Sequence, residues 1–84
     1  MIANAPPDPH DVLDAGEQSC GDLAIALKRA VARLRSGEIL KLLTRDPGAR
    51  ADVPAWCRVT GHRLLWGDGS TFFIQRKEIQ RKET

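Results

Sequence analysis

The sequence predicts an α+β fold, a two-layer sandwich in which a mixed four-stranded sheet carries two helices on one face. Three observations predict it. Two stretches place apolar residues at helical spacing, and Glu38 to Thr44 is an almost continuous apolar run typical of a central strand. Near the C-terminus, two short apolar runs flank Gly67-Asp68-Gly69-Ser70, a connection that suits a hairpin. The expected order is therefore β-α-β-α-β-β.

The first half of the chain predicts a strand, a helix and a second strand. Asp11 to Asp14 is a short strand candidate, and the helix begins near Gly21. Ser36-Gly37 ends the helix, with Gly37 able to adopt a left-handed cap. The apolar helical face consists of Leu23, Leu27, Ala30, Val31 and Leu34. Two strands joined by a helix should pair in parallel.

The second helix should follow the turn Asp46-Pro47-Gly48, where Asp46 can cap the helix and Pro47 suits its first turn. Pro54 lies inside the helical stretch and predicts a kink or restart that Asp52 could cap. Gly61 should end the helix. Its apolar stripe consists of Ala49, Val53, Trp56, Cys57 and Thr60.

The remaining strands are His62 to Trp66 and Thr71 to Lys77, which should pair antiparallel. With 84 residues, the chain suffices for one domain, which we place at residues 11–77. We expect residues 1–10 to be a disordered lead-in and residues 78–84 to be a polar, basic tail.

Composition excludes several classes of protein. Two cysteines do not make a disulfide framework, and the net charge of +2 does not by itself indicate nucleic-acid binding. No apolar run approaches the roughly 20 residues of a membrane span, and the N-terminus lacks the features of a signal peptide. These observations predict a cytoplasmic protein whose thiols stay reduced.

Cys20 is the candidate catalytic residue. It stands at the predicted junction between a strand and a helix, where unpaired backbone N–H groups favour an anion such as a thiolate. Glu17 and Asp22 are close in sequence, and their carboxylates disfavour a thiolate. The sequence alone leaves open which effect is larger. Cys57, on an apolar helical stripe, is interpreted as a buried structural thiol.

The order of the elements, the cysteine before the first helix and the stretch from Asp46 to His62 resemble the TusA/SirA-like small sulfur-carrier family, over roughly residues 11–77. The stretch from Asp46 to His62 is the close part, with an acidic-Pro turn, a helix with the pattern Asp-aliphatic-Pro-x-Trp-Cys, and a Gly-His exit. The resemblance implies a carrier that receives sulfane sulfur from a cysteine desulfurase or another sulfurtransferase and passes it to a downstream relay protein. It implies a persulfide on Cys20 and neither an organic cofactor nor a metal.

The family's Cys-Pro-x-Pro motif reads Cys20-Gly21-Asp22-Leu23 here, so both prolines are missing. Prolines would preset the first helical turn, whereas Gly21 adds backbone freedom. We expect Gly21, Asp22 and Asp46 to bind partners. Family members serve tRNA thiolation, cofactor sulfuration or sulfur metabolism.

Three other interpretations use different residues. The chain could be a non-catalytic interaction or regulatory module in which the thiol is incidental. It could bind RNA weakly through the basic tail and a sheet face that carries Arg63, Trp66, Phe72 or Phe73, and Arg76. Cys57 and His62 have the spacing of two metal ligands, but no second pair accompanies them.

Overall fold

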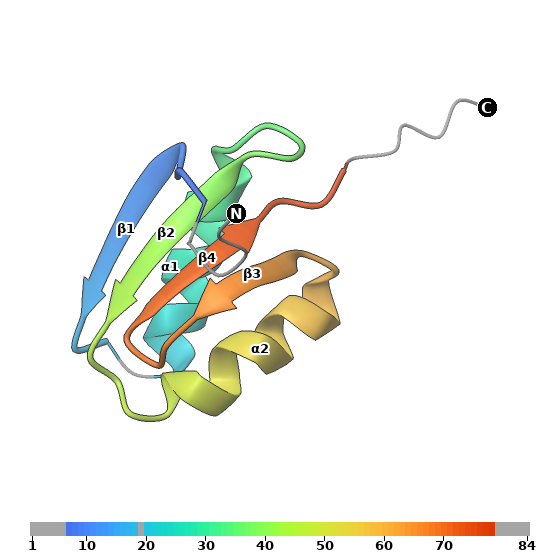
Figure 1. Cartoon of the computed structure of the whole chain (residues 1–84). Coiled ribbons are helices and arrows are strands. Elements are labelled where there is room, and N and C mark those ends of the chain that lie inside the picture. Colours follow the sequence, from blue (N-terminus) through green and yellow to red (C-terminus); the bar gives the residue numbers. More distant parts are fainter. Residues whose placement is uncertain (1–6, 19, 79–84) are drawn as a thin grey trace.

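A computed structural model describes residues 7–18 and 20–78, apart from the side chain of Cys20. The predicted order of elements is confirmed, and the strands form one sheet in the order β1-β2-β4-β3 (Figure 1). Most of the expected lead-in and tail lies outside the described residues. The elements are β1 (Asp11–Gly16), α1 (Cys20–Ala32), β2 (Ile39–Thr44), α2 (Ala49–Thr60), β3 (Arg63–Gly67) and β4 (Thr71–Gln75).

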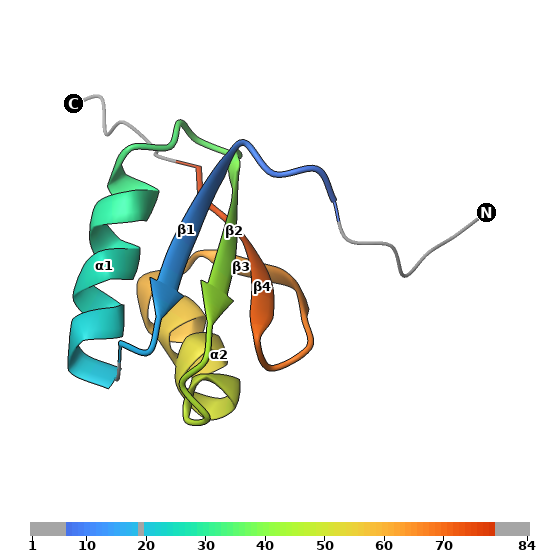
Figure 2. The same cartoon turned by 90° about the vertical axis from the view of Figure 1, so that its left-hand side faces the viewer.

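The sheet is mixed, as predicted. β1 pairs with β2 in parallel, whereas β4 pairs antiparallel with both β2 and β3. The apolar run of the sequence forms β2, which lies between β1 and β4 as a central strand should. Both helices pack on the same face of the sheet, and the opposite face carries no helix (Figure 2).

The core lies between this sheet face and the helices. Alternation along the strands turns Leu40, Leu42 and Ile74 toward the helices, and none of the three has any exposed surface. The predicted stripe of α1 is entirely buried against them. From α2 the core receives Ala49, Val53 and Cys57, with Trp56 packed at its margin.

The predicted interruption of α2 is wrong. Pro54 lies within a continuous helix from Ala49 to Thr60, so Asp52 does not cap a second segment. Proline removes one helical hydrogen bond. Val53 and Cys57 are buried on either side of Pro54, and we attribute the continuity of the helix to their packing on the sheet.

The regular turns of α2 begin later than the sequence predicts. The N-cap residue is Gly48, which makes no side-chain capping bond, and Pro47 precedes it. Asp46 nevertheless makes the bond expected of a capping carboxylate, because its Oδ1 accepts a hydrogen bond of 3.3 Å from the N–H of Gly48, two residues later. Gly61 ends the helix as predicted, with φ of 87° and its N–H bonded to the Cys57 carbonyl.

α1 ends earlier than the sequence predicts. Its regular turns stop at Ala32, after which Arg33 and Leu34 donate to carbonyls three residues back, as in a tighter helical turn. Gly37 has the expected left-handed conformation, but it lies in the following turn.

The chain after β4 holds the C-terminal ends of both helices. Arg76 Nη1 donates to the carbonyls of Val31, Ala32 and Leu34 at the end of α1. Lys77 Nζ donates to the carbonyl of Thr60, the last residue of α2, at 2.8 Å. Each cation thus satisfies carbonyls that the helix leaves unpaired, at its negative end.

Replacing Arg76 with alanine should lower the free energy of unfolding by about 1 to 2 kcal/mol, because several half-buried carbonyls lose a charged donor. Urea unfolding measures the change. Arg63→Ala, at an exposed position on the neighbouring strand β3, is the matched control and should change stability by less than about 0.5 kcal/mol. Equal effects of the two substitutions would contradict the capping role.

Candidate functional site

Cys20 is the first residue of α1 and therefore stands at the amino end of a helix. β1 leads into it through Gly16, whose φ of 57° turns the chain, and the turn is closed by a bond from Gln18 N–H to the Ala15 carbonyl. Both helices begin at the same end of the molecule (Figure 1). The amino ends of the two helices, which are the positive ends of their dipoles, therefore share this end with Cys20.

Acidic side chains surround the start of α1. Asp22 is exposed in the first turn of α1, and Asp52 is half-buried in the first turn of α2. Asp46 is half-buried in the loop between β2 and α2, where its N–H donates to Thr44 Oγ1 at 3.1 Å. Gly21 is exposed, and no neighbouring group approaches the position of a β-carbon there.

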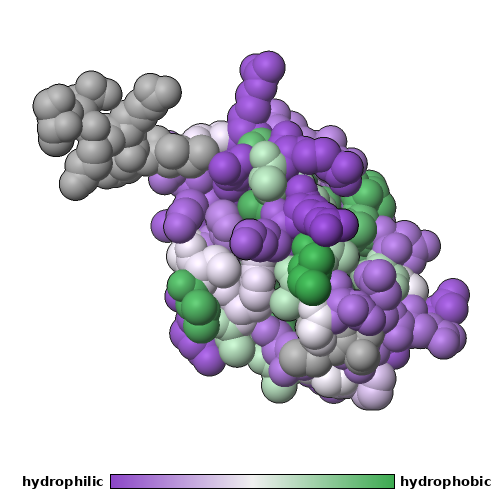
Figure 3. Space-filling model, turned by 180° about the vertical axis from the view of Figure 1, so that it is seen from behind, coloured by the Kyte–Doolittle hydropathy of each residue, from purple (hydrophilic) through white to green (hydrophobic). Residues whose placement is uncertain are grey.

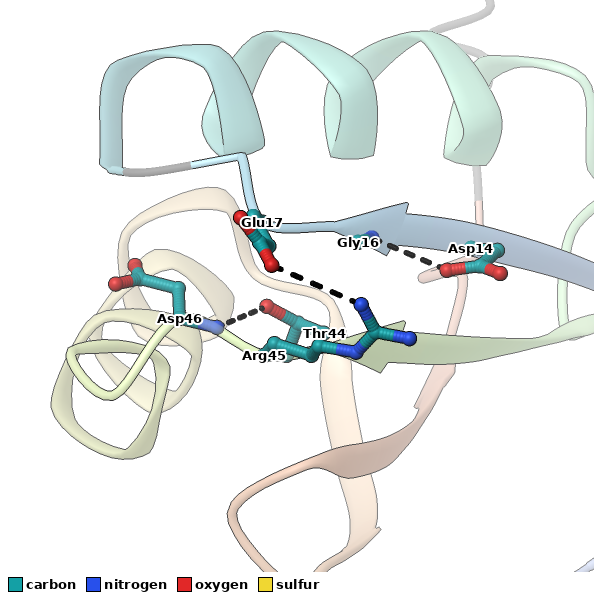
Figure 4. Close-up of polar contacts among 6 residues, drawn as sticks. All are labelled: Asp14, Gly16, Glu17, Thr44, Arg45 and Asp46. Atoms are coloured by element: carbon teal, nitrogen blue, oxygen red, sulfur yellow. Dashed lines mark hydrogen bonds and ion pairs between the residues drawn. The ribbon is translucent and has the colours of Figure 1, made fainter.

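The loops before α1 and α2 touch each other at this end. Figure 4 shows Glu17, from the loop before α1, beside Arg45 at the end of β2. Arg45 Nη1 lies 3.8 Å from Glu17 Oε2, and the Arg45 N–H donates to the Gly16 carbonyl at 2.7 Å. The structure thus brings the Cys20 loop and the Asp46 loop together, although they are far apart in sequence.

An apolar groove of about 230 Å³ runs between the two helices, starting one turn after Cys20. Its lining residues are Leu23, Ala24, Leu27, Asp52, Val53, Ala55, Trp56 and Val59. Val59 is 86% exposed, and Ile25, on the outer surface of α1, is 53% exposed. In Figure 3 this face shows separate hydrophobic areas among hydrophilic side chains.

Sequence reasoning missed this groove. The available signal was that Ile25 and Val59 are large apolar residues that do not belong to the two predicted stripes. Exposed apolar side chains around a groove are typical of a surface that binds another protein.

Cys57 is a buried structural thiol, as predicted. Its exposed fraction is 3%, and burial raises its pKa to about 11. Such a thiol stays protonated near neutral pH and is a poor nucleophile.

His62 is engaged in packing and hydrogen bonding. Its Nδ1 accepts a hydrogen bond of 3.1 Å from the Lys77 N–H, and its ring stacks on Trp56 with 5.4 Å between centroids. Partial burial and the nearby cations Lys77 and Arg76 lower its pKa. Among the described residues, no group of three or more His, Cys, Asp or Glu could hold a metal ion.

Several residues named for RNA binding make internal contacts. Phe72 belongs to the core, and Phe73, on the open face of the sheet, is only 4% exposed beneath the edge of Trp66. Arg76 donates a hydrogen bond to the Val31 carbonyl near the end of α1. Arg63 and Trp66 remain as the accessible part of that predicted surface.

Within the described part of the chain, no helix is both long and apolar enough to cross a membrane.

Comparison with known proteins confirms the family resemblance over the domain. The sequence model of the family described as sulfurtransferase TusA matches residues 11–76. The sulfur carrier protein TusA of Pseudomonas putida (strain GB-1) is 39% identical over 73 residues, which cover 82% of this chain and 91% of that protein. The putative sulfur carrier protein YrkI of Bacillus subtilis (strain 168) is 39% identical over 69 residues, covering 77% and 92%.

His62 should make stability depend on pH. Its pKa in the folded state lies below the ordinary value of about 6.5, so the unfolded chain takes up the proton first. The contribution of His62 is therefore complete above about pH 6.5 and declines as the pH falls toward the folded-state pKa. Urea unfolding of the wild type and His62→Gln should show a stability difference that is larger at pH 7.5 than at pH 5.5. A difference independent of pH would contradict this assignment.

Proposed function

The chain belongs to the TusA sulfurtransferase family, and from that membership we propose that it is a sulfur carrier that accepts and relays sulfane sulfur as a persulfide on Cys20. The family match supports this most directly, because it spans residues 11–76 and thus includes the thiol at the start of α1. The buried and weakly acidic Cys57 thiol is unsuited to the role.

The transfer needs no redox partner. The Cys20 thiolate attacks the terminal sulfur of a donor persulfide, forming the Cys20 S–S bond and breaking the donor's S–S bond, so that the donor leaves as a thiolate. Cys20 then carries the persulfide. An acceptor thiolate attacks its terminal sulfur in the same way, which returns Cys20 as a thiolate and gives a persulfide on the acceptor.

The start of α1 can favour the thiolate that this chemistry requires. The first N–H groups of a helix have no partner within it, and its amino end is electropositive. Gly21 adds to these donors, because a proline at this position would have no N–H. The missing prolines therefore reduce rigidity at the site and leave one more donor near the sulfur.

The surroundings of Cys20 suit a protein partner. The groove between the helices is apolar, and its end nearest Cys20 carries Asp52, with Asp22 in the adjoining turn of α1. We propose that the sulfur donor, a cysteine desulfurase or another sulfurtransferase, places an apolar side chain in this groove and basic residues against Asp22 and Asp46. Gly21 leaves room for close approach.

The acceptor is then a downstream sulfur-relay protein that uses the same end of the molecule, because the persulfide is formed there. We place this relay in the cytoplasm, where thiols stay reduced. Its product would feed tRNA thiolation, cofactor sulfuration or sulfur metabolism.

Incubation with a low-molecular-weight persulfide should add one sulfur atom to the protein, detected by intact-mass spectrometry and removed by a reductant. Cys20→Ala should abolish the gain, because it removes the nucleophile, whereas Cys57→Ala should retain it. A wild-type protein that gains no sulfur while retaining its fold would favour the non-catalytic interaction module.

Replacing both Val59, which lines the groove, and Ile25, which is exposed on α1, with glutamine should slow sulfur uptake from the donor protein about tenfold or more, because apolar surface on the helices is lost. Neutral glutamine leaves the charge around Cys20 unchanged. Val12→Gln is the matched control, since Val12 is 53% exposed like Ile25 but lies on β1, away from the helices.

The rate at which a small reagent alkylates Cys20 should be the same in the wild type, in the variant with Ile25 and Val59 replaced, and in Val12→Gln. If the groove variant transfers sulfur at the wild-type rate, the donor docks elsewhere.

A further inference from the structure

The loop before Cys20 contains an acidic residue, Glu17, whose carboxylate can act against the thiolate in two ways. It can repel the negative charge, and it can itself bind the unpaired N–H groups at the start of α1. Glu17 stands three positions before Cys20, so their Cα atoms lie at most about 11 Å apart. The position of this carboxylate therefore matters for the reactivity of Cys20.

The backbone places Arg45 beside Glu17. Gly16 is paired with Thr44 at the end of the parallel ladder between β1 and β2, and the Arg45 N–H donates to the Gly16 carbonyl at 2.7 Å. The left-handed turn at Gly16 then brings Glu17 over the end of β2 (Figure 4). Strand pairing, rather than the ion pair, keeps the two residues together.

The ion pair itself is open to solvent. Arg45 Nη1 and Glu17 Oε2 are 3.8 Å apart, and the two side chains are 77% and 82% exposed. Pairs of this kind add little to stability, so we do not assign it a folding role. In the structure it places the Glu17 carboxylate beside Arg45 at the end of β2 (Figure 4).

The other arginine at this end does not share this role. The Arg50 guanidinium packs over Gly69 in the connection between β3 and β4, where a β-carbon on Gly69 would come within 2.6 Å of Arg50 Nε. Arg50 thus provides a matched control of the same charge.

We infer that Arg45 is a positioning residue that keeps the Glu17 carboxylate away from the amino end of α1, leaving the N–H donors there to the Cys20 sulfur. The inference rests on the proposed function of Cys20, but its test uses alkylation, which needs no sulfur donor. Failure of the test and failure of sulfur carriage can therefore be told apart.

The test is a double-mutant cycle between Arg45 and Glu17 in the full chain with Cys57→Ala, so that one thiol reacts. The rate of Cys20 alkylation by iodoacetamide is measured against pH at low ionic strength. Arg45→Gln should move the midpoint of the profile up by about 0.3 to 0.5 pH unit, the size expected for one carboxylate about 8 Å away in water. At pH 7 the rate should fall about two- to threefold.

Removing the carboxylate should reduce this effect. In the Glu17→Ala background, Arg45→Gln should shift the midpoint clearly less than in the wild-type background, because only the loss of the Arg45 charge remains. Arg45→Lys should behave like the wild type, since a lysine can still pair with Glu17. Arg50→Gln, which changes the net charge equally, should leave the midpoint unchanged.

Two results would overturn the inference. An equal shift from Arg45→Gln with and without Glu17 would mean that Arg45 acts on the sulfur by its charge alone. An equal shift from Arg50→Gln would mean that only the net charge of this end matters.

Discussion

Parallel pairing of β1 with β2 is the constraint on which the rest of the molecule depends. Parallel strands end at the same edge of a sheet, and each of these strands is followed by a helix. The amino ends of α1 and α2 therefore lie together, with the Cys20 loop against the Asp46 loop. The same pairing sets Gly16 beside Thr44, which makes Glu17 and Arg45 neighbours.

The two ends of each helix carry side chains of opposite charge. Acidic residues, Asp22 and Asp52, occupy the first turns, and basic residues, Arg29 and Arg58, occupy the last turns. Each charge opposes the helix dipole nearest to it. At the carboxyl ends, Arg76 and Lys77 bind the unpaired carbonyls directly. The positive ends of both helix dipoles thus lie at the end with Cys20, while charged donors occupy the opposite end.

Local pattern was enough to predict most of the fold. The stripe of α1 and the apolar run of β2 follow from side-chain period and burial, which neighbouring residues determine. Pro54 misled the prediction because local propensity favours a break, whereas the packing of Val53 and Cys57 on the sheet is a property of the whole domain. Asp46 accepts a backbone N–H bond as a capping carboxylate does, but its residue type does not determine at which residue the regular helix begins.

The contacts between distant segments could not be predicted from local pattern. Arg76 reaches carbonyls 42 to 45 residues earlier in the chain. The groove needs two helices side by side, and the pair of Glu17 with Arg45 needs the strand register. Cys20 could be proposed from sequence because its place before a helix and its correspondence to the cysteine of the family's motif are both local.

The two cysteines of the chain stand in different positions in the fold. Cys57 faces the sheet from the middle of α2, where burial penalises the thiolate and raises the pKa to about 11. Cys20 begins α1, where backbone dipoles favour an anion and where the connection from β1 is only a few residues long. Burial in a small domain thus keeps the Cys57 thiol protonated near neutral pH. In the proposed function, Cys20 is the thiol presented to a partner, the groove and the acidic residues select that partner, and the position of Glu17 affects how readily the sulfur reacts.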